Sequence, residues 1–513
     1  MLFRHAAVVA GLIAAAPAFA APPPAPQDPV AKGQYLATVG DCVSCHSAPG
    51  GKPLAGGLAI DTPFGKIVSP NITPDKDTGI GNWSDDQFYA AMHEGLGKGG
   101  EYLYPAMPFV SYTKVTRDDV MAIKAYIFSL PPVNNKVVSD TLPFPFSVRQ
   151  SLAVWRAMFF REGTFEPDPK KSAQINRGAY LVQGLGHCAE CHSQRNVLGG
   201  IKNGTKLEGG VIDGWYAPNI TSDMRGGIGK WSENDLVAFL KTGTAKDHSV
   251  VIGPMSEVVH RSLAGVTDAD LHAIAAYLKS TPAKADPTSR QTTSGKVFVP
   301  GEAVYLNNCA GCHQLNGEGL PGRIPPLAGN GAVLAAGAQD VLGAVYGGIG
   351  AQGTYGPMPA FGGLLSDQDI ADVANYVRTA WKNGAPANAA PGQVAELAKT
   401  IHPALSGPQA SCPPPPAGGA ALSDPKNGIT AMLGGIDQSN MLPSVDSVLT
   451  KARATVPDAA QADVVNGLIA AYCPTLASNT ALDPAQRRDM LNRFGQLVYS
   501  QLVTGGGTPG HKN

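Results

Sequence analysis

The chain has 513 residues, and its 39 basic and 40 acidic side chains give a formal net charge of −1 at pH 7. Proteins that bind nucleic acid or an anionic membrane mainly by charge carry a basic excess, so this balance argues against both modes of binding. Charged residues make up only 15% of the chain, and its length predicts three or four domains.

The first twenty residues have the pattern of an export signal. Arg4 and His5 precede an apolar run, and Ala18-Phe19-Ala20 matches a small-residue cleavage site. The run is too short to span a bilayer comfortably, and no later segment has eighteen consecutive apolar residues. We expect residues 1–20 to be a cleaved signal peptide and the mature chain to lie in the periplasm. An uncleaved membrane anchor is the alternative.

The pattern Cys-x-x-Cys-His, which is typical of c-type haem attachment, occurs three times. Cysteines three residues apart lie on one side of a helical turn, so both thiols reach one porphyrin and the next histidine points at the iron. A redox dithiol does not need the histidine, and a zinc ribbon would pair two such motifs within one small domain. We therefore expect three covalent haem c groups, attached through Cys42, Cys45, Cys188, Cys191, Cys309 and Cys312, with His46, His192 and His313 as iron ligands.

The first two motifs belong to a duplicated pair of domains. Residues 69–84, which contain Pro-Asn-Ile-Thr and Gly-Ile-Gly-Asn-Trp-Ser, recur at residues 217–232 with ten of sixteen positions identical. The asparagines Asn71 and Asn219 are 148 positions apart (219 − 71), close to the 146 positions between the first cysteines of the two motifs (188 − 42). A repeat on this scale indicates two copies of one domain with small insertions.

Each haem domain is expected to begin and end with a helix. A glycine followed by tyrosine and leucine precedes each motif, at Gly33, at Gly178 and, in a looser form, at Gly301. Later in each domain, apolar residues recur at steps of three and four after an acidic or hydroxyl start. This pattern predicts amphipathic closing helices at residues 118–130, 268–279 and 366–381. The segments between are rich in Gly and Pro, which fits a small, mainly α fold wrapped around haem.

Proline-rich and small-residue joints divide the chain. They predict cytochrome domains at residues 27–135, 173–285 and 293–385, an extended connecting segment at 136–172, and a helical C-terminal region at 392–505.

The C-terminal region has helical patterns at residues 445–455, 458–472 and 484–503. A small bundle with its own core is the simpler interpretation, and a docking or membrane-facing helix is the alternative. Cys412 and Cys473, the two cysteines outside the motifs, are expected to form a disulfide, with two free thiols as the alternative.

A second axial ligand is needed on the other face of each haem. Each domain has a methionine close to proline before its closing helix, at Met107, Met255 and Met358, and the first two are again 148 positions apart (255 − 107). A thioether ligand favours Fe(II) and raises the potential, so we expect these three to bind iron. Ordinary core methionines are the alternative. Other candidates do not occupy matching positions in the domains: Met92, Met224, His93, His248, His260 and His272.

The neighbours of the haem ligands can also be anticipated. The second ring nitrogen of each haem histidine should donate to a backbone carbonyl, for which Pro70, Pro218 and the Pro325-Pro326 pair are candidates. Trp83 and Trp231 pack either on haem or in the protein core. A G-x-G-x-x-G match at residues 348–353 lacks a βαβ unit and an acidic ribose ligand, so we do not expect a nucleotide site there.

These motifs resemble the three-haem cytochrome c subunits of membrane-bound periplasmic dehydrogenases, whose partners oxidise alcohols, aldehydes, gluconate or sorbitol. The resemblance covers about residues 30–385 and rests on the three haem motifs and the repeated Pro-Asn-Ile-Thr and Trp-Ser block. It implies three tandem class I-like cytochrome c domains, with the cysteines, histidines and methionines named above as the haem-binding residues. The last hundred residues match no motif of that family.

The resemblance also implies a function. Such a subunit takes electrons from a catalytic dehydrogenase subunit and passes them through its haems to ubiquinone or a downstream oxidase, at the periplasmic face of the cytoplasmic membrane. It does no substrate chemistry of its own. A multihaem redox enzyme such as a peroxidase and a free-standing soluble electron shuttle are the alternatives; the former would need one haem with an open sixth position.

Overall fold

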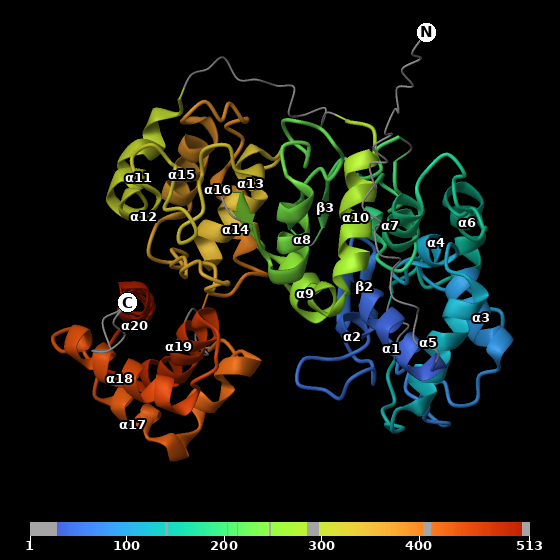
Figure 1. Ribbon diagram of the computed structural model, residues 1–513, viewed down its shortest axis with the longest axis horizontal. Helices are drawn as coiled ribbons and strands as arrows, with labels where there is room; N and C mark the ends of the chain where they lie inside the picture. Colours follow the sequence, from blue (N-terminus) through green and yellow to red (C-terminus); the bar gives the residue numbers. More distant parts are fainter. Residues whose placement is uncertain are drawn as a thin grey trace, which may run out of the picture.

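The computed structural model describes residues 28–138, 142–202, 204–212, 214–245, 248–284, 297–403 and 412–504. The expected signal peptide, residues 1–20, lies outside the described residues. In the described part, helices dominate and strands form only two-stranded antiparallel sheets. The mainly α class is therefore confirmed, and Figure 1 shows the helices in consecutive groups along the chain.

Two of these groups carry the first two motifs. The first haem region, residues 28–138, contains α1 (Pro29–Val39), α2 (Cys42–Cys45), β1 (Ala59–Thr62), β2 (Gly65–Val68), α3 (Asp85–His93), α4 (Phe109–Tyr112) and α5 (Arg117–Ser129). A connecting segment, residues 142–172, carries α6 (Leu152–Phe159). The second haem region, residues 173–284, contains α7 (Ala173–Gln183), β3 (Gly210–Ile212), β4 (Trp215–Ala217), α8 (Glu233–Thr242), β5 (Thr244–Ala245), β6 (Ser249–Val250), α9 (Pro254–Arg261) and α10 (Asp268–Ser280).

The remaining groups carry the third motif and the C-terminal helices. The third haem region, residues 297–403, contains α11 (Glu302–Asn308), α12 (Ala310–His313), α13 (Gly331–Leu334), α14 (Gln339–Gly347), α15 (Asp367–Thr379) and α16 (Pro391–Leu397). Although the expected boundary at 392 separates most of α16 from this region, its Val394 and Leu397 are buried in the core around α14 and α15. The C-terminal region, residues 412–504, contains α17 (Ile429–Gly434), α18 (Met441–Thr455), α19 (Gln461–Ser478) and α20 (Pro484–Thr504).

The closing helices α5, α10 and α15 match the predicted segments within one or two residues. Each begins with the same N-cap, because the hydroxyl of Thr116, Thr267 or Ser366 accepts a hydrogen bond from the backbone N–H three residues later. That bond satisfies one of the donors left open at a helix start. An acidic residue supplies each of those N–H groups, which also suits the positive end of the helix.

The glycine before each motif allows the first and last helices of a region to cross at backbone contact. A Cβ atom on Gly33 would lie 1.8 Å from the carbonyl oxygen of Ala122 in α5. The corresponding distance is 1.9 Å for Gly178, against α10, and 2.0 Å for Gly301, against α15. Any larger residue would push the helices apart, which explains why the first helical segment of each region has a glycine at this position.

The repeated Asn-Ile-Thr block ties the chain that follows the closing helix back to the domain. The buried side chain of Asn71 donates from Nδ2 to the carbonyl of Val133 at 2.8 Å, and its Oδ1 accepts from Thr73. In the second copy, Asn219 donates to the carbonyl of Lys284 at 2.6 Å. The repeat is therefore structural at these positions, since it fixes the exit of each closing helix.

The first two haem regions pack together through a reciprocal pair of hydrogen bonds. Tyr35 of α1 donates to Asp270 of α10 at 2.6 Å, and Tyr180 of α7 donates to Asp119 of α5 at 2.5 Å. Each tyrosine thus binds an acid of the other region, as expected when two copies of a domain face each other. Each acid also forms an ion pair within its own region, Asp119 with Lys32 and Asp270 with Arg177.

The C-terminal region has a core of its own. Residues such as Val464, Leu468, Tyr472 and Phe494 are fully buried there. Cys412 and Cys473 form a disulfide that joins the start of the region to α19. Apolar faces from four helices meet inside it, which fits the simpler of the two interpretations of these helices.

Candidate haem-binding sites

The three Cys-x-x-Cys-His motifs share one backbone hydrogen bond. In each, the histidine N–H donates to the carbonyl of the first cysteine, at 3.0, 3.0 and 2.9 Å in chain order. This single turn places both cysteines and the histidine on one side, as attachment to one porphyrin requires. The first two motifs follow a residue with positive φ, Asp41 at 49° and His187 at 35°, whereas the third follows Asn308 without such a turn.

The three histidines are oriented by the carbonyls that the sequence indicated. Nδ1 lies 2.9 Å from the oxygen of Pro70 for His46, 2.7 Å from Pro218 for His192, and 3.1 Å from Pro325 for His313. A ring whose Nδ1–H donates to a carbonyl keeps Nε2 available to bind a metal. Burial lowers the pKa of all three, so each ring is neutral at pH 7, the form that binds iron.

The motif cysteines do not have the character of a redox dithiol. Burial raises the pKa of Cys42, of Cys188 and of Cys309 to about 12. Reactive Cys-x-x-Cys pairs instead have a lowered pKa, because the thiolate is the nucleophile. Thiols with a raised pKa therefore argue against the redox-dithiol alternative.

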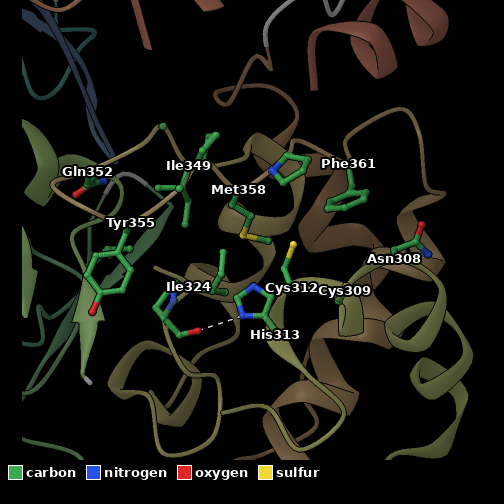
Figure 2. Close-up of a pocket in the computed structure, with 16 residues that line it drawn as sticks. Asn308, Cys309, Cys312, His313, Ile324, Ile349, Gln352, Tyr355, Met358 and Phe361 are labelled. Atoms are coloured by element: carbon green, nitrogen blue, oxygen red, sulfur yellow. Dashed lines mark hydrogen bonds between the residues drawn. The ribbon is translucent and has the colours of Figure 1, made fainter. Parts of the chain in front are cut away.

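The third site contains a pocket that is partly open to solvent. Its lining includes Cys309, Cys312, His313, Met358 and Phe361. Figure 2 shows the Met358 sulfur, the Cys312 thiol and the His313 ring facing the same space, with the dashed bond from His313 to Pro325 on one side. The residues present would therefore fit a haem group attached to Cys309 and Cys312, with His313 and Met358 available to bind its iron.

The other two methionines are positioned less completely. Met107 lies between a turn at Tyr104 and α4, and it packs against the core cluster that also contacts Cys42. Met255 is half-buried in the first turn of α9, a helix that lies against α2 of the first haem region. Iron ligation by Met107, Met255 and Met358 stays a prediction.

The alternative candidates for the second iron ligand lie in the protein core, in solvent or against other side chains and backbone groups. Met92 is buried in the core of the first region, and Met224 is 60% exposed. Among the histidines, His248 stacks on Trp231 at 4.5 Å between ring centroids, and His272 lies 3.0 Å from Glu233. The remaining two also have neighbours, since His93 stacks on Tyr89 and His260 bonds to the carbonyl of Ser256.

Sequence reasoning missed the contacts between sites. Tyr112 of α4 is buried between the first two motifs; its hydroxyl donates to the carbonyl of Gly40 at 3.3 Å and its ring lies 5.7 Å from that of His187. Val250 of the second region lines the cavity of the third site. The G-x-G-x-x-G match lies in the loop between α14 and Met358, beside that cavity, and Ile349 pairs with Met358 through two backbone hydrogen bonds.

Comparison with known proteins identifies cytochrome c relatives of this chain. The cytochrome c family profile matches residues 30–131 and 298–381. The chain is 41% identical over 397 residues to the gluconate 2-dehydrogenase cytochrome c subunit of Pantoea cypripedii, covering 72% of this chain and 89% of that one. It is 40% identical to the cytochrome c subunit of the quinone alcohol dehydrogenase of Gluconacetobacter polyoxogenes, covering 76% and 88%. It is 38% identical to the fructose dehydrogenase cytochrome subunit of Gluconobacter japonicus, covering 72% and 83%.

Proposed function

Because the chain belongs to the family of dehydrogenase cytochrome c subunits, whose role is electron transfer, we propose that it carries three haem c groups and receives electrons from a catalytic dehydrogenase. The observation that carries the haem number is the threefold recurrence of one local geometry. Each motif has the same histidine-to-cysteine turn and the same histidine-to-proline hydrogen bond. A backbone carbonyl that orients a histidine ring in this way is typical of histidines that bind a metal.

Each site divides the work among a few residues. Haem, when bound, supplies the one-electron chemistry of its iron. The two cysteines of a motif would attach the porphyrin, and the proline carbonyl holds the histidine ring in one orientation. Met107, Met255 and Met358 would supply the second iron ligand of each haem, and the support is most direct at the third site, where Met358 and His313 line one pocket. A thioether ligand would stabilise the reduced state and would leave no open position for substrate.

The contacts between regions support a relay with the second site in the middle. Tyr112 and His187 join the first and second motifs, while Val250 of the second region reaches the third cavity. The backbone N–H of Tyr216 also donates to Asp340 of the third region at 2.9 Å. In Figure 1 the second region lies between the other two. Electrons that enter at either outer site would pass through the second haem.

The cellular setting follows from the same family. The named relatives are subunits of gluconate, alcohol and fructose dehydrogenases, so a dehydrogenase of this kind is the expected partner, with a quinone or a terminal oxidase as acceptor. None of the described helices is long and apolar enough to cross a membrane. We infer export by the N-terminal signal and peripheral attachment to the inner membrane through the complex.

Haem content and copurification test this proposal. The chain is expressed with a c-type maturation system, and the haem-to-protein ratio is measured for the wild type and for variants in which one motif at a time carries Cys→Ser at both cysteines. The expected result is three haems in the wild type and two in each variant. Two haems in the wild type, or no loss in one of the variants, would overturn the assignment. A dehydrogenase subunit that copurifies and reduces the haems with its substrate would identify the partner.

A further inference from the structure

The C-terminal region contacts the third haem region at the loop that contains Met358. We name residues 349–361 the methionine loop. Its Ala351 is 5% exposed and belongs to the hydrophobic core of the C-terminal region. Both backbone groups of Ala351 are bound by Asn466 of α19, since the N–H donates to Oδ1 at 2.9 Å and the carbonyl accepts from Nδ2 at 2.8 Å.

Helix α20 holds the other half of the loop. Asn492 donates to the carbonyl of Ala360 at 3.0 Å, Gln496 donates to Pro357, and the hydroxyl of Tyr499 donates to Thr354 at 2.8 Å. Positions 492, 496 and 499 lie on one face of a helix, so a single rigid element binds three carbonyls around Met358.

Tyr499 also reaches the loop on the histidine side of the cavity. Its hydroxyl lies 3.2 Å from the carbonyl of Arg323, which also accepts the N–H of Gly356 at 3.0 Å. Arg323 is two residues before Pro325, whose carbonyl orients His313. The ring of Tyr499 lies directly on Gly356, because a Cβ there would come within 2.4 Å of it. One side chain therefore joins the methionine loop to the segment whose Pro325 carbonyl orients His313.

The opposite side of the methionine loop rests on the second haem region. Gln352 donates to the carbonyl of Val251 at 2.7 Å, and Tyr355 donates to that of Ala245 at 3.4 Å. The loop is thus enclosed between two neighbours. Inside it, Ile349 pairs with Met358 and Gln352 pairs with Tyr355 through backbone hydrogen bonds. The position of the Met358 sulfur depends on these internal pairs together with the contacts to the two neighbours.

We propose that the C-terminal region is an intramolecular clamp that fixes the methionine loop and thereby sets how firmly Met358 binds the third iron. The proposal rests on the assignment of Met358 as a ligand under the proposed function. Asn466, Asn492, Gln496 and Tyr499 are positioning residues, because they act on the sulfur through the loop backbone. Weakening the clamp lets a competing ligand displace the thioether, while the haem count stays unchanged.

The test measures imidazole binding to the oxidised, three-haem protein by visible spectroscopy. Tyr499→Phe removes the hydroxyl that donates to the carbonyls of Thr354 and Arg323. Gln496→Ala, the second variant, removes the donor to the carbonyl of Pro357. Tyr472→Phe is the matched control, since its hydroxyl donates to the carbonyl of Ile436 at 3.1 Å within the C-terminal core. The loss of one buried hydrogen bond corresponds to about a tenfold change in an equilibrium. We expect imidazole to bind one haem about tenfold more tightly in Tyr499→Phe and Gln496→Ala, and as in the wild type in Tyr472→Phe.

Met358→Ala identifies the haem concerned, because it should bind imidazole at that same haem with no competition. Wild-type affinity in both clamp variants would overturn the proposal. An equal gain in Tyr472→Phe would also overturn it, since general loss of stability would then explain the effect. Failure of the underlying ligand assignment gives a different result: Met358→Ala would leave imidazole binding unchanged.

Discussion

The helix crossing at Gly301 gives the sharpest stability prediction. In Gly301→Ala, the new Cβ would lie 2.0 Å from the carbonyl oxygen of Asp372 and 2.8 Å from the Cβ of Tyr376, whereas ordinary contacts begin near 3.4 Å. The start of α11 and α15 must therefore separate by roughly 1.4 Å (3.4 − 2.0). Overpacking of this kind costs about 1–3 kcal/mol, and a central value of about 2 kcal/mol corresponds to a roughly 30-fold change in a local opening equilibrium.

Hydrogen exchange followed by mass spectrometry tests this locally, which avoids assuming that a multi-region protein unfolds in one step. Amides of α15 should exchange about 30-fold faster in Gly301→Ala. Gly331→Ala is the control in the same region, because a Cβ there meets nothing within 4 Å. It should leave exchange in α15 unchanged or slightly slower. Unchanged exchange in Gly301→Ala, or equal acceleration in both variants, would refute the close-crossing explanation.

Three further predictions concern the contacts between and within regions. Burial raises the pKa of the Asp340 carboxyl to about 7. Between about pH 4 and pH 7 the carboxyl therefore loses its proton in the unfolded chain but keeps it in the folded chain. The free energy of unfolding falls as pH rises through that window. The melting temperature of Asp340→Asn should depend less on pH in that window than the wild type's. The same dependence in both proteins would contradict the raised pKa of Asp340. Removing the disulfide by Cys412→Ala with Cys473→Ala opens a loop with a sequence separation of 61 residues, and the chain-entropy model predicts a loss of about 4 kcal/mol, measured by urea unfolding of the C-terminal core. Tyr35→Phe and Tyr180→Phe each remove a hydrogen bond to a carboxylate of the other region and should each cost about 1.5–3 kcal/mol in denaturant unfolding; a loss in only one would show that the interface is not reciprocal.

Local patterns predicted most of each haem site. A Cys-x-x-Cys-His turn, its N-capped closing helix and the proline that accepts the histidine N–H depend on short stretches of chain, so their spacing carries the information. The repeat of Asn71 and Asn219 revealed the duplication, but its role in tying back Val133 and Lys284 needed the contacts that span more than 60 positions.

The contacts that connect the sites could not be predicted in this way. Tyr499 and Thr354 are 145 positions apart, and nothing in the pattern of α20 separates a face that packs its own core from one that binds a neighbouring loop. The G-x-G-x-x-G match is a second feature whose neighbours the sequence does not predict. Its glycines suit a loop that passes close to other segments, and only the fold shows that the neighbour is the Met358 site.

Anaerobic reductive titration in the presence of carbon monoxide tests the central claim most directly. Three haems with two firm axial ligands each should accept three electrons per chain, and none should bind carbon monoxide. Two electrons per chain would contradict the three-haem relay. Tight carbon monoxide binding at one haem would instead indicate an open iron and a catalytic role.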